Sequence, residues 1–224
     1  MKLQTNYLGT VYQFKDFKDL FAKANEEKSG DRLAGIAAAT VQERIAAKEV
    51  LSYLKLSDIR ENPLISPEND EVSRVIESQI NEPIYRSIKN WSVAELREYI
   101  LSDSTTGEDL KRISRGMNSE MIAAVAKIMS NLDLVHSANK IEVLSKCNIT
   151  IGYKGTLASR LQPNHPTDNV EGVIASLKEG LSYGIGDAVI GINPVDDSVE
   201  SVKRLLHATY DFIQNWEIPT QNCV

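Results

Sequence analysis

Three polar side chains are the residues of this sequence best suited to binding a small polar ligand: Arg160, Gln162 and Asn193. The Arg160 guanidinium keeps its positive charge and donates through a planar fork of N–H groups to an oxygen. The amides of Gln162 and Asn193 each offer a donor and an acceptor. Together these groups suit a ligand that is uncharged or cationic.

The positions of these residues matter as much as their types. Arg160 and Gln162 end a predicted strand over 156–162, and Asn193 ends a second one over 188–193. Residues two apart on a strand project to the same side, and parallel α/β folds bind ligands at the carboxyl ends of their strands. A second interpretation stays open: the two amides form turns before the prolines that follow them, and the arginine is a surface charge.

Two amphipathic segments follow these strands and predict covering helices. The first is capped by Asp168 or Asn169, and the second runs from Asp197 or Ser198 to about Trp216. Their expected inward residues are Val170, Val173, Ile174, Leu177 and Leu181 in the first, and Val199, Val202, Leu206 and Ile213 in the second. Residues 221–224 open a third strand, so the order is β-α-β-α-(β), typical of a parallel sheet.

This pattern fits either an open doubly wound sheet or a (β/α)8 barrel. A chain that ends as a strand begins leaves its sheet unfinished, so we expect the sequence to be part of a longer protein. Residues 149–224 form this α/β region.

Residues 1–148 are expected to be mostly helical. After a short β-like run over 7–14, helices are predicted over 16–28, 41–54, 93–101 and 120–129. Two of them begin with the Ser/Thr-x-x-Glu pattern of a capping box, Thr40 to Glu43 and Ser92 to Glu95. The fold class is therefore α/β, with a helical N-terminal region before the first β/α units.

Composition excludes several classes of protein. The 224 residues carry a formal net charge of −6, and Lys and Arg are interspersed with Asp and Glu and form no basic face, so we expect no nucleic-acid partner. No apolar run approaches the roughly 20 residues of a membrane span, and the N-terminus lacks a secretory signal. Cys147 and Cys223 fit no disulfide or zinc pattern and are predicted to be structural. We expect a soluble cytoplasmic protein without a metal site.

Several motifs resemble those of the ethanolamine ammonia-lyase large subunit family, which is the catalytic subunit of that enzyme. The most specific are residues 159–164 (SRLQPN), 186–194 (GDAVIGINP) and 218–221 (IPTQ), joined by likenesses at 11–16, 22–26, 29–31, 33–35, 88–92, 95–99 and 123–128. The resemblance runs along the whole chain, and the family's large subunit is about twice as long.

The resemblance implies a helical N-terminal region followed by a (β/α)8 TIM barrel. It also implies a lyase that uses adenosylcobalamin in a radical conversion of ethanolamine to acetaldehyde and ammonia. Arg160, a catalytic residue, and Asn193 would bond the substrate hydroxyl, and Gln162 would accept from the ammonium group. Pro194 and Asn193 match positions that touch the cobalamin.

The partners implied are the small subunit and other large subunits in a hetero-oligomer, within a bacterial microcompartment. The family holds the ammonium group chiefly with carboxylates beyond residue 224, so we expect this chain by itself to be inactive. Two alternatives remain. One is an inactive truncated fragment that acts only in subunit assembly, and the other is an unrelated barrel lyase or aldolase with Lys154 as a Schiff-base amine. Lys154 precedes the strand, which counts against the latter.

Overall fold

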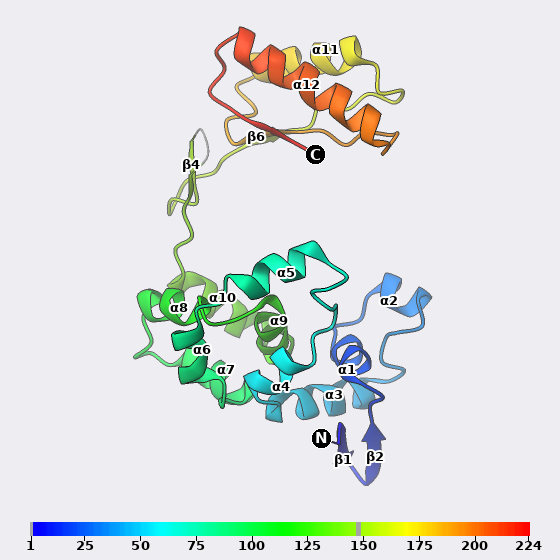
Figure 1. Ribbon diagram of the computed structural model, residues 1–224, viewed down its shortest axis with the longest axis vertical. Coiled ribbons are helices and arrows are strands. Elements are labelled where there is room, and N and C mark those ends of the chain that lie inside the picture. Colours follow the sequence, from blue (N-terminus) through cyan, green and yellow to red (C-terminus); the bar gives the residue numbers. More distant parts are fainter. Residues whose placement is uncertain (1, 147–148) are drawn as a thin grey trace. The chain divides into compact units, whose positions relative to one another are not determined.

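A computed structural model describes residues 2–146 and 149–224 (Figure 1). The chain divides after Ile141 into two compact units, which we describe separately. Cys147 lies outside the described residues, and so does residue 148 at the predicted boundary between the regions. The predicted structural role of Cys147 and the boundary at 148/149 therefore stay predictions.

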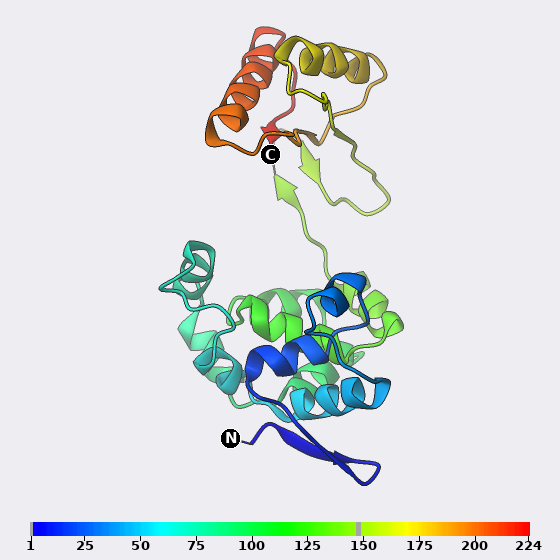
Figure 2. The same ribbon diagram turned by 90° about the vertical axis from the view of Figure 1, so that its right-hand side faces the viewer.

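Unit 1 is largely helical and begins with a β-hairpin (Figure 2). Its elements are β1 (Gln4–Tyr7), β2 (Thr10–Gln13), α1 (Phe17–Lys23), α2 (Ser29–Leu33), α3 (Val41–Tyr53), α4 (Leu56–Glu61), α5 (Glu71–Ser78), α6 (Glu82–Ile88), α7 (Val93–Leu101), α8 (Gly107–Ser114), α9 (Ser119–Ile128) and α10 (Asn131–Lys140). The predicted β-like run over 7–14 is interrupted, because Leu8 and Gly9 both adopt positive φ and turn the chain back.

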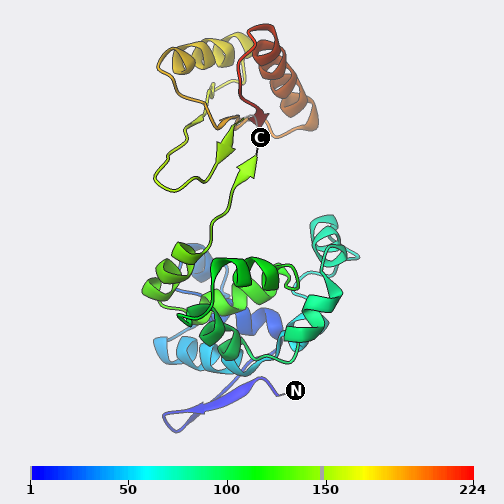
Figure 3. The same cartoon turned by 90° about the vertical axis from the view of Figure 1, so that its left-hand side faces the viewer.

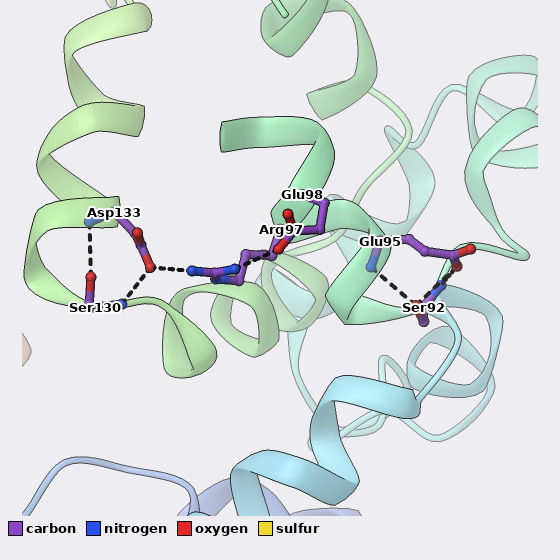
Figure 4. Close-up of polar contacts among 6 residues, drawn as sticks. All are labelled: Ser92, Glu95, Arg97, Glu98, Ser130 and Asp133. Atoms are coloured by element: carbon purple, nitrogen blue, oxygen red, sulfur yellow. Dashed lines mark hydrogen bonds and ion pairs between the residues drawn. The ribbon is translucent and has the colours of Figure 1, made fainter. Parts of the chain in front are cut away.

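Side-chain caps explain where several of these helices begin. The predicted capping box of α7 is confirmed, since Ser92 accepts from the Glu95 amide at 3.1 Å and the Glu95 carboxylate accepts from the Ser92 amide at 2.7 Å (Figure 4). Thr40 likewise caps α3 by accepting from the Glu43 amide at 3.1 Å. The reciprocal bond differs from the box pattern, because the Glu43 carboxylate accepts from the Ala39 amide at 2.6 Å.

The predicted helix over 16–28 is shorter than expected, since α1 ends at Lys23. The side chain of Asn25 lies outside the helix, donates to Asp31 at 3.3 Å and accepts from the Lys127 ammonium. Asparagine favours such local and tertiary bonds over continued helix, which accounts for the early end.

The core of unit 1 lies among helices from all parts of its sequence. Its largest fully buried side chains are Leu20, Leu51, Leu54, Leu56, Ile59, Ile88, Leu96 and Met121. At the edge of this core, Arg97 of α7 donates to Asp133 of α10 at 2.7 Å (Figure 4). Apolar burial, at about 25 cal/mol per Å², is the main source of stability. The ion pair contributes little energy and orients α7 relative to α10.

Unit 2 contains a parallel sheet whose helices lie on one face (Figure 3). Its elements are the short antiparallel pair β3 (Ser145–Lys146) and β4 (Thr150–Ile151), then β5 (Arg160–Leu161), α11 (Val170–Ser182), β6 (Val189–Gly191), α12 (Val199–Asn215) and β7 (Asn222–Cys223). The order β5-β6-β7 with a helix in each connection agrees with the predicted β-α-β-α-β sequence. The fold is a mixture of helix and parallel sheet, as α/β implies.

The inward stripe of α11 is confirmed, with Val173 and Leu177 buried against Ile192 and Ile190 of the sheet. The predicted inward residues of α12 were partly wrong, because Val199 is 69% exposed. The inward positions instead recur every four residues and are Ser201, Leu205, Thr209 and Ile213. Two of them are polar, so a search for apolar residues passes over them.

The predicted strand over 156–162 was too long, since only Arg160 and Leu161 pair with β6. The ladder stops at Ser159, whose amide donates to the Asp187 carboxylate at 2.6 Å and not to a neighbouring strand. Without a strand beside them, residues 156–158 form an exposed connection.

Candidate functional site

The sheet of unit 2 has two unlike faces. Leu161 and Ile190 contact the helices in one apolar cluster, and Ile192 contacts them in a second. Because side chains alternate along a strand, the residues beside them project from the opposite face. That open face carries Arg160, Val189 and Gly191 within the strands, and Gln162 and Asn193 follow just after the strand ends.

Arg160 lies across the neighbouring strand at Gly191. A Cβ placed on Gly191 would lie 2.5 Å from Cζ of Arg160 and closer still to Nε and Nη2. Glycine is thus the residue that leaves room for the guanidinium over β6. The Arg160 side chain is exposed and makes no hydrogen bond or ion pair with the described residues, so its donors are available.

Gln162 directly follows β5, and Asn193 follows the end of β6 by two residues, so both lie at the carboxyl ends of these strands. Both are exposed, and their side-chain amides make no bond within 2–146 or 149–224. Pro194 follows directly and is half-buried. The structure therefore brings the predicted residues to the carboxyl ends of two paired strands, where the polar groups of their side chains have no partner among the described residues.

Two residues that the sequence did not single out as site residues join the loops after these strands. The Asn164 side chain, from the loop after β5, accepts from the Asn193 amide at 3.0 Å. The Asp168 carboxylate accepts from the amides of Val195 at 2.9 Å and Asp196 at 2.8 Å. These amide bonds hold the pKa of Asp168 below its usual value.

Asp168 was predicted only as a possible helix cap. That task belongs to Asn169, whose side chain accepts from the Gly172 amide at 2.8 Å. The partners of Asp168 lie 27 and 28 positions further along the chain, so no local pattern identifies them. The sequence hint to a role for Asp168 other than capping is its position directly before Asn169, which caps the helix.

A second carboxylate joins the strands at their amino ends. Asp187 accepts from the amide of Ser159 at 2.6 Å and also from its hydroxyl. These bonds lower the pKa of Asp187. The two strands that carry the candidate residues are thus tied together by a carboxylate at each end.

Other candidates take no part in this arrangement. Cys223 pairs in register with Gly191 and is half-exposed as a free thiol. Lys154 is exposed in a turn before β5. In the part of the chain that the structure describes, no group of His, Cys, Asp and Glu side chains could hold a metal ion, and no helix is long and apolar enough to cross a membrane.

Comparison with known proteins decides the family. The model described as "Ethanolamine ammonia lyase large subunit (EutB)" matches residues 12–224. The chain belongs to this family. It is 54% identical over 224 residues to the ethanolamine ammonia-lyase large subunits of Escherichia coli (strain K12) and Salmonella typhimurium (strain LT2).

These alignments cover 100% of this chain and 49% of each relative, so the chain spans about half the length of the large subunits it matches. Its correspondence to the N-terminal half of an ethanolamine ammonia-lyase large subunit confirms the resemblance seen in residues 159–164 and 186–194. The open face of unit 2 therefore belongs to a chain of the ethanolamine ammonia-lyase large subunit family.

Proposed function

We propose that unit 2 supplies part of the substrate site of an ethanolamine ammonia-lyase, which converts ethanolamine to acetaldehyde and ammonia with adenosylcobalamin. The observation that supports this most directly is the open face itself. In a chain of this family, Arg160, Gln162 and Asn193 lie at the carboxyl ends of two paired strands, and their side chains have no hydrogen-bond partner in the part of the chain that the structure describes.

Charge determines how ethanolamine would lie on this face. The substrate has a hydroxyl at one end and an ammonium group at the other, and the Arg160 cation repels the ammonium. The hydroxyl oxygen would therefore accept from Arg160, and Asn193 would bond the same hydroxyl. The amide oxygen of Gln162 would accept from the ammonium group. A fixed cation beside the substrate would also stabilise charge that shifts as the amino group migrates.

The residues at the end of β6 fit an adjoining cofactor. Pro194 presents a half-buried apolar ring. Beside it, the side-chain amide of Asn193 has no hydrogen-bond partner among the described residues. These two residues would hold adenosylcobalamin at the carboxyl ends of the strands. The cofactor would contribute the radical chemistry, while this chain contributes binding and orientation of the substrate.

The wider architecture is proposed to be a (β/α)8 barrel. Within the described residues, β5 and β7 each pair on one side, and the helices cover one face of the sheet. A barrel closed by strands from the second half of the large subunit would place the open face inside, where barrel enzymes bind substrates. We expect these 224 residues by themselves to be inactive, because radical chemistry requires a closed site.

Partners follow from the same proposal. The large subunit would assemble with the small subunit and with other large subunits, in the cytoplasm and inside a bacterial microcompartment. A catalytically inactive fragment that acts only in assembly is the alternative that the test below separates.

The test measures ammonia release from ethanolamine with adenosylcobalamin. A full-length large subunit containing this sequence is assembled with the small subunit and compared with its Arg160→Ala variant. Loss of a hydrogen bond from a charged donor costs about 1.5–3 kcal/mol, so we expect a roughly ten- to hundredfold lower kcat/KM.

Lys154→Ala is the matched control, because it removes an exposed cation that lies before the strand and should leave activity unchanged. No ammonia release by the unaltered full-length assembly would contradict the proposed function and favour the assembly role. Loss of activity in the Lys154 variant, together with trapping of a carbonyl adduct by borohydride, would favour the Schiff-base alternative.

A further inference from the structure

We propose that Asp168 and Asn164 are positioning residues for the segment Asn193–Pro194. Neither needs to touch the substrate. Each binds the backbone of the loop after β6 and so fixes the position of the Asn193 side chain. This inference deepens the proposed function and rests on it for the role of Asn193. Its structural part, the clamp between the two loops, can be tested without it.

The first observation is how fully the Asp168 carboxylate is used. Both of its oxygens face the Val195 amide, at 2.9 and 3.0 Å, and one of them accepts from the Asp196 amide at 2.8 Å. The Ser201 hydroxyl, at the start of α12, lies at 3.5 Å. Asp168 is 5% exposed. A buried carboxylate with these partners is committed to holding the loop after β6, because its loss would leave two amides without an acceptor.

The second observation is the backbone of Asp168, which has φ of 51°. Few residues other than glycine adopt this left-handed conformation, and Asp does so at a cost. The helix does not need Asp168 as a cap, since Asn169 fills that position. The conformation is instead what turns the side chain toward the neighbouring loop.

Within the described residues, Arg204 is a cation that contacts Asp168. Arg204 of α12 donates from Nη2 to the Asp168 carbonyl oxygen and to the Ser201 hydroxyl, each at 3.5 Å. The Asp196 carboxylate accepts from the Ser198 amide and hydroxyl, both at 2.9 Å, and the His165 ring lies beside Thr167. The carboxylate of Asp168 therefore binds the backbone amides of Val195 and Asp196 directly and holds the loop after β6 in position.

Asn164 completes the clamp on the other side of Asn193. Its side-chain oxygen accepts from the Asn193 amide at 3.0 Å. The segment from Asn193 to Asp196 is thus held by the loop after β5 at both ends. The Asn193 side chain between these bonds has no hydrogen-bond partner within residues 2–146 and 149–224. Asn193, which is proposed to meet the ligand, is thus oriented by Asn164 and Asp168, which are not.

The substitutions that test this change the hydrogen-bond acceptors of the clamp. In Asp168→Asn, one acceptor oxygen becomes an NH2 group that faces backbone donors. Asn164→Ala removes the acceptor for the Asn193 backbone amide. Asn164→Asp keeps an acceptor oxygen at that position and should keep the activity of the unaltered protein. Asp187→Asn is the matched control, because Asp187 also accepts from a backbone amide and a hydroxyl but at the amino ends of the same strands.

Two measurements are made on the full-length large subunit assembled with its small subunit. Hydrogen exchange in residues 192–198, without cofactor or substrate, reports the clamp. Steady-state kinetics with ethanolamine reports its consequence. We expect Asp168→Asn and Asn164→Ala to speed exchange in 192–198 at least about tenfold and to lower kcat/KM about ten- to hundredfold, since misplacement of a binding group by about 1 Å has effects of this size.

The control and the conservative variant separate positioning from general loss of stability. Asp187→Asn should lower the melting temperature without changing KM, and Asn164→Asp should match the unaltered enzyme in both measurements. Unchanged exchange in 192–198 for Asp168→Asn would overturn the clamp. Faster exchange with unchanged kcat/KM would overturn its role in positioning Asn193. Faster exchange in an assembly that releases no ammonia even when unaltered would support the clamp and contradict the proposed function instead.

Discussion

Gly191→Ala is expected to damage substrate binding while leaving the fold intact. The added Cβ would lie 2.5 Å from Cζ of Arg160. Carbon atoms in favourable contact are about 3.5–4.0 Å apart, so the guanidinium must move by roughly 1 Å or more. Because Arg160 is a flexible exposed side chain, it can swing away, and the backbone of β6 need not shift.

The magnitude follows from the proposed hydrogen bond between Arg160 and the substrate hydroxyl, which this movement would break. A hydrogen bond from a charged donor contributes about 1.5–3 kcal/mol, which corresponds to about a ten- to hundredfold change in affinity. We expect kcat/KM for ethanolamine to fall by that factor in the full-length assembly. Stability should hold or rise slightly, because alanine is favoured over glycine in a strand by roughly 0.5–1 kcal/mol.

Gly180→Ala is the matched comparison. Its added Cβ would overlap the side chain of Leu161, on the face of β5 that packs against α11. This substitution should lower the melting temperature, whereas Gly191→Ala should lower kcat/KM. An unchanged kcat/KM in the Gly191 variant, with the melting temperature also unchanged, would show that Arg160 does not act from the position seen here.

Two further predictions concern stability and pH. Leu51→Ala should lower the free energy of unfolding of unit 1 by about 2–5 kcal/mol in urea titration, because Leu51 is fully buried. Leu33→Ala, at a side chain that is 90% exposed, should change the free energy of unfolding by less than about 0.5 kcal/mol. Equal effects of the two substitutions would refute the assigned core. The pKa of Asp168 is lowered by its amide bonds, so its stabilising contribution should be present above the ordinary value of 3.8 and be lost as pH falls through the lower folded value. The amide NMR shift of Val195 should follow that titration, and a midpoint at or above 3.8 would contradict the bond.

The sequence by itself determined most of the local structure. Caps at Ser92, Thr40, Asn169 and Ser198 are read from short-range patterns, because a cap and its partner amide lie three residues apart. The β-α-β-α-β order and the inward stripe of α11 likewise follow from the periodicity of apolar residues. Residue type and position at the predicted strand ends identified Arg160, Gln162 and Asn193, and the family resemblance then implied a role for each.

Only the tertiary structure decided what surrounds those residues. The lengths of β5 and β6 depend on where a neighbouring strand begins, which no segment encodes by itself. The inward face of α12 includes Ser201 and Thr209, whose hydroxyls find partners in distant segments. The room that Gly191 leaves for Arg160 and the clamp from Asp168 to Val195 and Asp196 join residues about thirty positions apart. Such contacts arise from packing and not from local propensity, and they position the proposed site.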